Sequence, residues 1–248
     1  MKLLAFGCSY TIGAFSQRHI EPATYPAYPW PDRLGQLINC EVVNKGQGGV
    51  GNFYIANQVY NTVHDDSLVM VMWSGMDRVG RLVSKKEFLQ YDESNDYTAQ
   101  SSDGDEWIHG SPTSFVNPLA REKDKQFWKT YFSMFHTEED SYIQTLHYMV
   151  GVQEFLINRD IPYLFLTFRD IFTNRYGKYK RAKKLEDNII WDKFHFPNGK
   201  FGGMDEWVRE DKLHPRLKFT KDYHPSEKMH HKFAEYLYNL KELRYLFT

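Results

Sequence analysis

The stretch Phe6-Gly7-Cys8-Ser9-Tyr10-Thr11-Ile12-Gly13 follows the apolar run Leu3-Leu4-Ala5-Phe6 near the start of the chain. Such a run is typical of a buried first strand, and open α/β sheets place their ligands where such strands end. Gly7 and Gly13 favour tight turns on either side of Ser9, and a helix starting there favours negative charge beside the serine hydroxyl. Ser9 is therefore a candidate nucleophile, although a serine after a strand can equally cap the next helix.

Three more segments predict the rest of a parallel sheet. Residues 40–44 read as a short strand, 67–73 as a continuous apolar strand buried on both faces, and 161–167 as a later strand. Their exits carry small or polar residues, including Ser74-Gly75-Met76-Asp77-Arg78. Because the carboxyl ends of parallel strands meet at one edge of a sheet, we expect these exits to lie beside Ser9.

The loop Asn44-Lys45-Gly46-Gln47-Gly48-Gly49-Val50-Gly51-Asn52 is rich in glycine. Glycines let a backbone approach a ligand and aim N–H groups at an anion or an oxyanion. The loop lacks the Gly-Lys-Ser/Thr ending of a phosphate loop and the complete dinucleotide fingerprint, which disfavours a nucleotide-binding function.

The remaining segments predict one domain, residues 1–248, with insertions at about 80–125 and 173–216. The first insertion is polar and aromatic, and we expect it to form a lid or a small hairpin. The second insertion is basic, and we expect a helix near 188–193. Helical spacing fills 126–158, as one helix or two. Asp222-Tyr223-His224-Pro225-Ser226 then opens a last helix with Pro225 in its first turn, and an acid held beside a histidine can orient its imidazole.

Composition excludes several classes of function. The chain has 248 residues, with 31 Lys plus Arg against 32 Asp plus Glu, so nucleic acid is not an expected partner. Cys8 and Cys40 have no metal-ligand spacing, and we expect no metal. No apolar run approaches the roughly 18 residues of a membrane helix, and the first is too short for a signal peptide. We therefore expect a soluble, cytoplasmic protein, with its oligomeric state left open.

Four blocks in chain order resemble those of the SGNH (GDSL-type) hydrolases. They are Gly7-Cys8-Ser9-Tyr10-Thr11, Asn44-Lys45-Gly46-Gln47-Gly48-Gly49, Ser74-Gly75-Met76-Asp77 and Asp222-Tyr223-His224-Pro225-Ser226. The resemblance implies a flavodoxin-like three-layer α/β/α fold with a central parallel sheet, and esterase, lipase, deacetylase or acyltransferase chemistry without a metal. It also implies Ser9 as nucleophile and oxyanion donor, Gly49 as the second backbone donor, and His224 as general base.

Three departures from the family pattern affect the site. Cys8 replaces an aspartate that is not the catalytic acid. The acid nearest the histidine is Asp222, one residue closer than usual, with Glu210 or Asp211 as substitutes. Asp77 stands where the family has an oxyanion-donating asparagine, and an ionised carboxylate only accepts hydrogen bonds.

The missing third donor leaves several alternatives. The oxyanion hole has two backbone donors only, or Asn52 or Ser74 donates instead, or Asp77 is protonated, or catalysis is degraded. Arg78 and Arg169, each just past a strand exit, are expected to bind an anionic part of the substrate or to form structural ion pairs.

We expect a serine esterase that forms an acyl-enzyme on Ser9, with Asp222 and His224 completing a triad. The expected substrate is an O-acyl ester, such as an O-acetyl ester, of a carbohydrate or other small polar molecule, with no cofactor. The alternatives are an acyltransferase that uses the same site and a catalytically degraded module that binds carbohydrate.

Overall fold

The computed structural model describes residues 1–13, 28–83, 99–102, 105–111, 122–214, 218–219 and 224–241. Four parallel strands form its central sheet in the order β2-β1-β3-β7: β1 (Lys2–Gly7), β2 (Glu41–Gly46), β3 (Ser67–Trp73) and β7 (Tyr163–Thr167). Gly7, at the end of β1, lies in register with Gly46 of β2 and Met72 of β3. The exits of these strands therefore share one edge, as the sequence predicts.

Burial explains why these runs became strands. Every residue of β3 and of β7 is buried, and so are all residues of β1 after Lys2. A strand covered on both faces needs a continuous apolar sequence rather than an alternating one.

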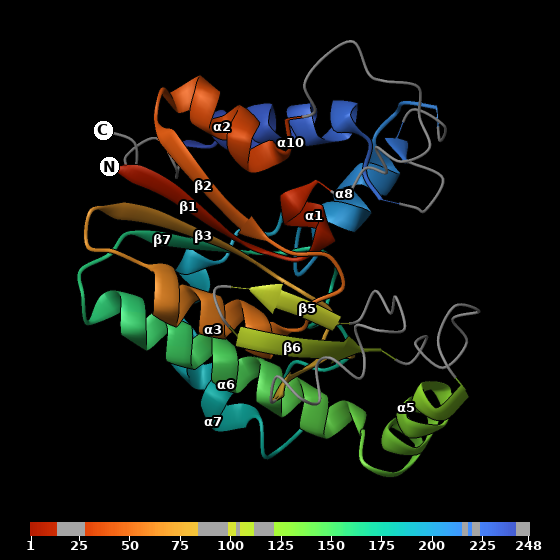
Figure 1. The fold of residues 1–248 in the computed structure, drawn as a ribbon. Helices are drawn as coiled ribbons and strands as arrows, with labels where there is room; N and C mark the ends of the chain where they lie inside the picture. Colours follow the sequence, from red (N-terminus) through yellow and green to blue (C-terminus); the bar gives the residue numbers. More distant parts are fainter. Residues whose placement is uncertain are drawn as a thin grey trace.

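Helices cover both faces of the sheet (Figure 1), which confirms the predicted α/β layering. On one side lie α2 (Trp30–Ile38) and α10 (Glu227–Tyr238), joined by the edge-to-face contact of Trp30 with Phe233 at 5.9 Å. On the other lie α3 (Asn52–Thr62) and α6 (Glu138–Ile157). Thr137 caps α6, because its hydroxyl accepts the Asp140 N–H.

The strand order fixes where a ligand can approach. β1 has β2 on one side and β3 on the other, so the connections that follow β1 and β3 run to opposite sides of the sheet. In doubly wound α/β proteins the crevice at such a switch point is the usual ligand site. Ser9, in the one-turn helix α1 (Ser9–Ile12), comes directly after it.

The first insertion contains more regular structure than the expected hairpin. Strands β4 (Val79–Val83), β5 (Ala99–Ser102) and β6 (Asp105–Gly110) form a separate antiparallel sheet in the order β4-β6-β5, and helix α5 (Glu122–Met134) follows. Fully buried Trp107 of β6 packs edge to face on Tyr54 of α3 at 5.2 Å. This contact anchors the small sheet to the α/β layers.

In the second insertion, the helix predicted at 188–193 is wrong. Helix α7 spans Lys183–Asn188, a 3-10 turn spans Trp191–Lys193, and α8 spans Met204–Glu210. The chain is extended at Ile189 and Ile190 because Ile190 N–H donates to Gln153 Oε1 of α6 at 2.8 Å. Around Phe172, the rings of Trp191 and Phe201 pack at 5.1 and 5.2 Å, so these loop aromatics build core.

Pro225 lies before α10 and not, as the sequence predicted, in its first turn, because the helix begins at Glu227. It precedes Ser226, whose hydroxyl caps α10 by accepting the Met229 N–H, and it forms an isolated bridge with Phe219.

None of the helices in the described ranges has both the length and the apolar content needed to cross a membrane.

Candidate active site at the sheet edge

Ser9 lies at the switch point with its side chain almost covered. It is 4% exposed, and its Oγ makes no hydrogen bond to any of the described residues. As the first residue of α1, it has a backbone N–H with no partner inside the helix. A buried hydroxyl without a partner costs about 1–3 kcal/mol, which is the kind of cost that functional sites carry.

Two glycines create the space around the serine turn. A Cβ at Gly7 would lie 2.1 Å from Thr11 Oγ1, and one at Gly46 would lie 2.4 Å from the Ile12 nitrogen. The first and second sequence blocks therefore pack backbone against backbone. Asn44 reinforces this contact, since its Nδ2 donates to the Thr11 carbonyl at 3.0 Å.

Gly49 lies in an open part of the second loop. Its φ is +78°, a left-handed conformation that favours glycine, and a Cβ there would have no atom within 4 Å. Gly51, by contrast, lies against the turn after β3, since its Cβ would meet the Arg78 carbonyl at 2.4 Å. The loop is thus fixed at Gly51 and accessible to a ligand at Gly49.

Asn52 connects this loop to the exit of β3. Its Oδ1 accepts the Ser74 N–H at 2.7 Å, and its Nδ2 donates to the Ser74 carbonyl at 3.1 Å and to Thr145 Oγ1 at 3.2 Å. Asn52 and Ser74 are both buried. In this arrangement the Asn52 amide positions the loop, and its donor capacity is used by the protein.

Two arginines lie over Phe168, which follows β7, and one of them pairs with Asp77. Asp77 Oδ1 accepts from Arg169 Nη2 at 2.8 Å. The guanidinium carbons of Arg169 and Arg78 lie 5.1 and 5.2 Å from the Phe168 ring centroid. Arg78 Nη1 also donates to Ser74 Oγ at 3.2 Å. Of the two roles expected for these arginines, Arg169 takes the ion pair.

His224 reaches the same edge from the segment before α10. Its ring lies 5.7 Å from the ring of Tyr10, the neighbour of Ser9, and Tyr10 in turn lies 5.0 Å from Phe168. Tyr10 Oη donates to Asp205 Oδ1 at 3.0 Å. Burial and the Asp205 carboxylate raise the pKa of Tyr10, so it stays a neutral hydrogen-bond donor.

The expected acid, Asp222, lies outside the described residues. Its two suggested substitutes are engaged elsewhere: Glu210 Oε1 accepts from Asn198 Nδ2, and Asp211 Oδ2 pairs with Lys232. The Lys232 ammonium also lowers the pKa of Asp211. Asp222 therefore remains the predicted catalytic acid.

The structure therefore brings residues that follow the four parallel strands to one edge of the sheet, with His224 from the segment before α10 and Asp205 from α8. Tyr10, Phe168 and Asp205 belong to this site although the sequence analysis did not select them as site residues. The available signals were the position of Tyr10 directly after Ser9 and that of Phe168 directly after the strand predicted at 161–167. Within the described ranges, His, Cys, Asp and Glu side chains form no group of three suited to a metal ion.

No protein-family model matches the chain, and no curated protein sequence does either. Several solved structures are similar to it. A lipolytic protein of the G-D-S-L family from Desulfitobacterium hafniense DCB-2 is 14% identical, with 96% of this chain and 97% of that chain covered and a TM-score of 0.48. A catalytic mutant of the acetylxylan esterase Axe2 from Geobacillus stearothermophilus is 14% identical, with 98% and 96% covered and a TM-score of 0.48.

The alpha/beta hydrolase LAE5 from the metagenome of Lake Arreo is 16% identical, with 94% and 91% covered and a TM-score of 0.45. Proteins of the G-D-S-L family, whose sequence blocks this chain resembles, are thus among the solved structures similar to it.

Proposed function

We propose that the chain is a serine esterase that cleaves an O-acyl ester through an acyl-enzyme on Ser9. The observation that carries the proposal is the Ser9 hydroxyl, buried at the switch point without a hydrogen-bond partner among the described residues. The open backbone of Gly49 and the half-buried ring of His224 against Tyr10 support it. Catalytic hydrogen bonds commonly tighten only when substrate binds, so a serine without a bonded base is compatible with this role.

The reaction follows from these positions. Ser9 Oγ attacks the ester carbonyl carbon while a ring nitrogen of His224 takes its proton, and the carbonyl oxygen becomes the oxyanion. The backbone N–H groups of Ser9 and Gly49 donate to that oxyanion. His224 returns the proton to the departing alcohol, which leaves an acyl group on Ser9. Water, deprotonated by His224, then attacks the acyl carbon; the bond from that carbon to Ser9 Oγ breaks, His224 returns the proton to Ser9 Oγ, and the acid is released. Asp222 orients the histidine in both steps.

The hydrogen bonds of Asn52 and Asp77 disfavour both residues as a third oxyanion donor. The Asn52 amide is occupied by Ser74 and Thr145, and Asp77 accepts from Arg169. We therefore propose an oxyanion hole with two backbone donors. Each donor in such a hole is worth about 10²–10³ in turnover, so this enzyme has less transition-state stabilisation than one with three.

The test uses a fluorophosphonate probe and 4-nitrophenyl acetate with wild type, Ser9→Ala and Ser67→Ala. Ser67 is a matched control because it is a buried serine at the opposite end of β3. We expect label and turnover in wild type and Ser67→Ala and neither in Ser9→Ala, with the labelled peptide containing Ser9. Folded wild type that neither labels nor turns over contradicts the proposal.

Product analysis with added alcohols then separates hydrolysis from acyl transfer. We expect free acid as the main product, because the proposal has water resolving the acyl-enzyme. Transfer of the acyl group to an added alcohol in preference to water identifies an acyltransferase instead.

A further inference from the structure

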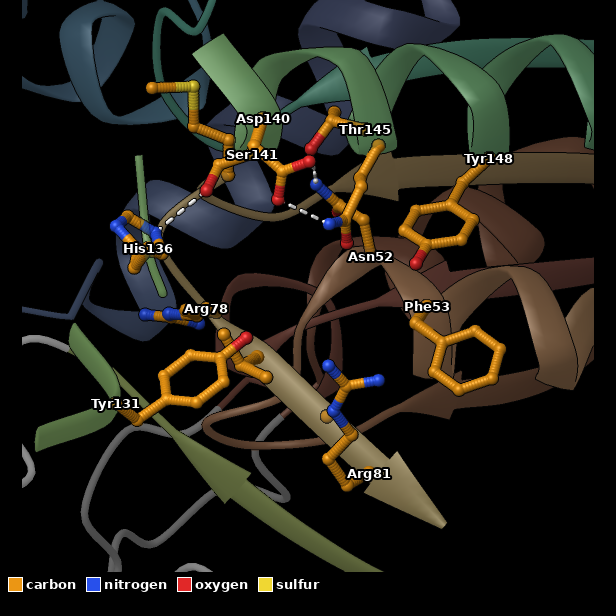
Figure 2. A pocket seen from close by; sticks show the side chains of 14 residues that line it. Asn52, Phe53, Arg78, Arg81, Tyr131, His136, Asp140, Ser141, Thr145 and Tyr148 are labelled. Atoms are coloured by element: carbon orange, nitrogen blue, oxygen red, sulfur yellow. Dashed lines mark hydrogen bonds between the residues drawn. The ribbon is translucent and has the colours of Figure 1, made fainter. Parts of the chain in front are cut away.

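A cavity lies close to the candidate active site, between α3, β4, α5 and the first turns of α6 (Figure 2). Its volume is about 40 Å³, more than one water molecule needs, so it can admit a small polar group. We call it the arginine pocket because Arg78 and Arg81 line it, together with Tyr131, His136 and Tyr148. Figure 2 shows the Arg81 guanidinium and the Tyr131 hydroxyl turned toward its centre.

Arg78 and Arg81 differ from most of the described arginines in their charge partners. Arg159, Arg169, Arg175 and Arg209 each form an ion pair with a carboxylate. Within the part of the chain that the structure describes, neither Arg78 nor Arg81 does. The one acid in the lining, Asp140, accepts from Gln144 Nε2 at 2.5 Å. Two guanidinium groups against one carboxylate leave the arginine pocket with an excess of positive charge.

Further donors point to the same kind of ligand. His136 is held at the wall beside Arg78 by a 2.8 Å hydrogen bond between its Nε2 and Ser141 Oγ (Figure 2). Burial raises the pKa of Tyr148, so its hydroxyl remains protonated and able to donate. Guanidinium and hydroxyl groups around a small space match the acceptor oxygens of an oxyanion.

Contacts connect the arginine pocket to the active site. Asn52 lines the pocket and is also the residue that holds Ser74 at the exit of β3. The Arg78 guanidinium lies over Phe168, and Phe168 packs on Tyr10, the neighbour of Ser9. A substrate whose ester lies at Ser9 therefore has the arginine pocket on the side of the β3 exit.

We propose that the arginine pocket binds an anionic group of the ester substrate, a carboxylate or phosphate carried on the molecule whose ester Ser9 cleaves. The assignment of this group to a substrate rests on the proposed function, whereas the binding of an oxyanion by the pocket does not. The substrate class is then an anionic ester rather than a neutral one.

The experiment has two arms. In the first, wild type, Arg81→Gln and Arg78→Gln are compared on 4-acetoxybenzoate and on its neutral methyl ester at low ionic strength. We expect kcat/KM of wild type to be at least about tenfold higher for the anionic ester, a preference that both variants lose. The control is Arg159→Gln, because Arg159 pairs with Asp65 away from this pocket, and it keeps the preference. Equal rates on both esters in wild type, or equal losses on both in Arg81→Gln, overturn the proposal.

In the second arm, inorganic phosphate is titrated calorimetrically into Ser9→Ala and into Ser9→Ala/Arg81→Gln. We expect saturable binding in the first and at least about tenfold weaker binding in the second. Because neither variant needs to turn over, this arm separates failure of the pocket from failure of the esterase proposal. No binding by Ser9→Ala, or equal binding by both proteins, contradicts the pocket.

Discussion

His230 makes the fold sensitive to mild acid. It lies in α10 with no exposed surface, and its Nδ1 accepts the Trp30 N–H of α2 at 3.2 Å. Burial, followed by the nearby His231 and His224, lowers its pKa to about 3. A proton on Nδ1 would remove the acceptor that joins these two helices.

His109 of β6 has the same property on the other side of the molecule. It is 2% exposed, stacked on Trp107 and edge to face with Tyr54. Neither of its ring nitrogens has a hydrogen-bond partner among the described residues. Burial, and then the Arg78 charge, lowers its pKa to about 4.

The magnitude follows from the difference between folded and unfolded chains. An unfolded histidine titrates near pH 6.5, so between that pH and the folded pKa the unfolded chain binds a proton that the folded chain does not. The free energy of unfolding therefore falls as the pH falls. From pH 7.5 to 5 each histidine removes about 2 kcal/mol, and both remove about 4 kcal/mol, a large part of the roughly 5–15 kcal/mol of a typical domain.

Denaturant unfolding at pH 7.5 and pH 5 measures this loss for wild type, His109→Phe and His64→Gln. We expect the free energy of unfolding to fall by about 4 kcal/mol between these pH values for wild type and by about 2 kcal/mol for His109→Phe. His64→Gln should show the same loss as wild type, because the His64 side chain is exposed. Comparing two pH values within one variant cancels any change in packing. If His109→Phe loses as much stability as wild type, the reasoning about buried neutral histidine is wrong.

Three further substitutions test the site. Asp77→Ala keeps kcat within about threefold if the oxyanion hole has only backbone donors, whereas a loss of about 10²–10³ shows that Asp77 donates. Asn52→Ala leaves the buried N–H and C=O of Ser74 without their partner, so it costs about 2–4 kcal/mol of unfolding free energy and lowers turnover. Gly46→Ala forces a methyl group into the backbone of the serine turn and lowers both the melting temperature and turnover, while Gly48→Ala, with open space around its Cβ, leaves the melting temperature unchanged.

Local sequence was sufficient to predict the strands and the position of Ser9. Three of the four parallel strands, β1, β3 and β7, are continuous apolar runs because both of their faces are buried, and parallel pairing brings the strand exits together without further information. The glycine loop could also be predicted from local sequence. The backbone of Gly46 packs so closely on the serine turn that only glycine fits there.

The remaining features depend on partners far apart in the chain. Tyr10 and Asp205 are 195 positions apart, and the pair of Asp77 with Arg169 spans 92. Neither pairing leaves a periodic or spacing signal in the sequence. The helix predicted at 188–193 failed for a similar reason, because the backbone at Ile190 is held in an extended form by Gln153 of a distant helix.

The division of the molecule into a parallel sheet and a separate antiparallel one has a consequence for how its specificity can change. Ser9, Gly49 and His224 belong to the loops of the parallel sheet, whereas Arg81, Tyr131 and the antiparallel strands come from the continuous stretch of chain between Val79 and Met134. Exchanging that one stretch between related proteins would alter what is bound beside the serine without rebuilding the reacting groups. On the two proposals above, part of the selectivity can therefore change separately from the chemistry, while Arg78, His136 and Tyr148 of the arginine pocket, which lie outside this stretch, stay in place.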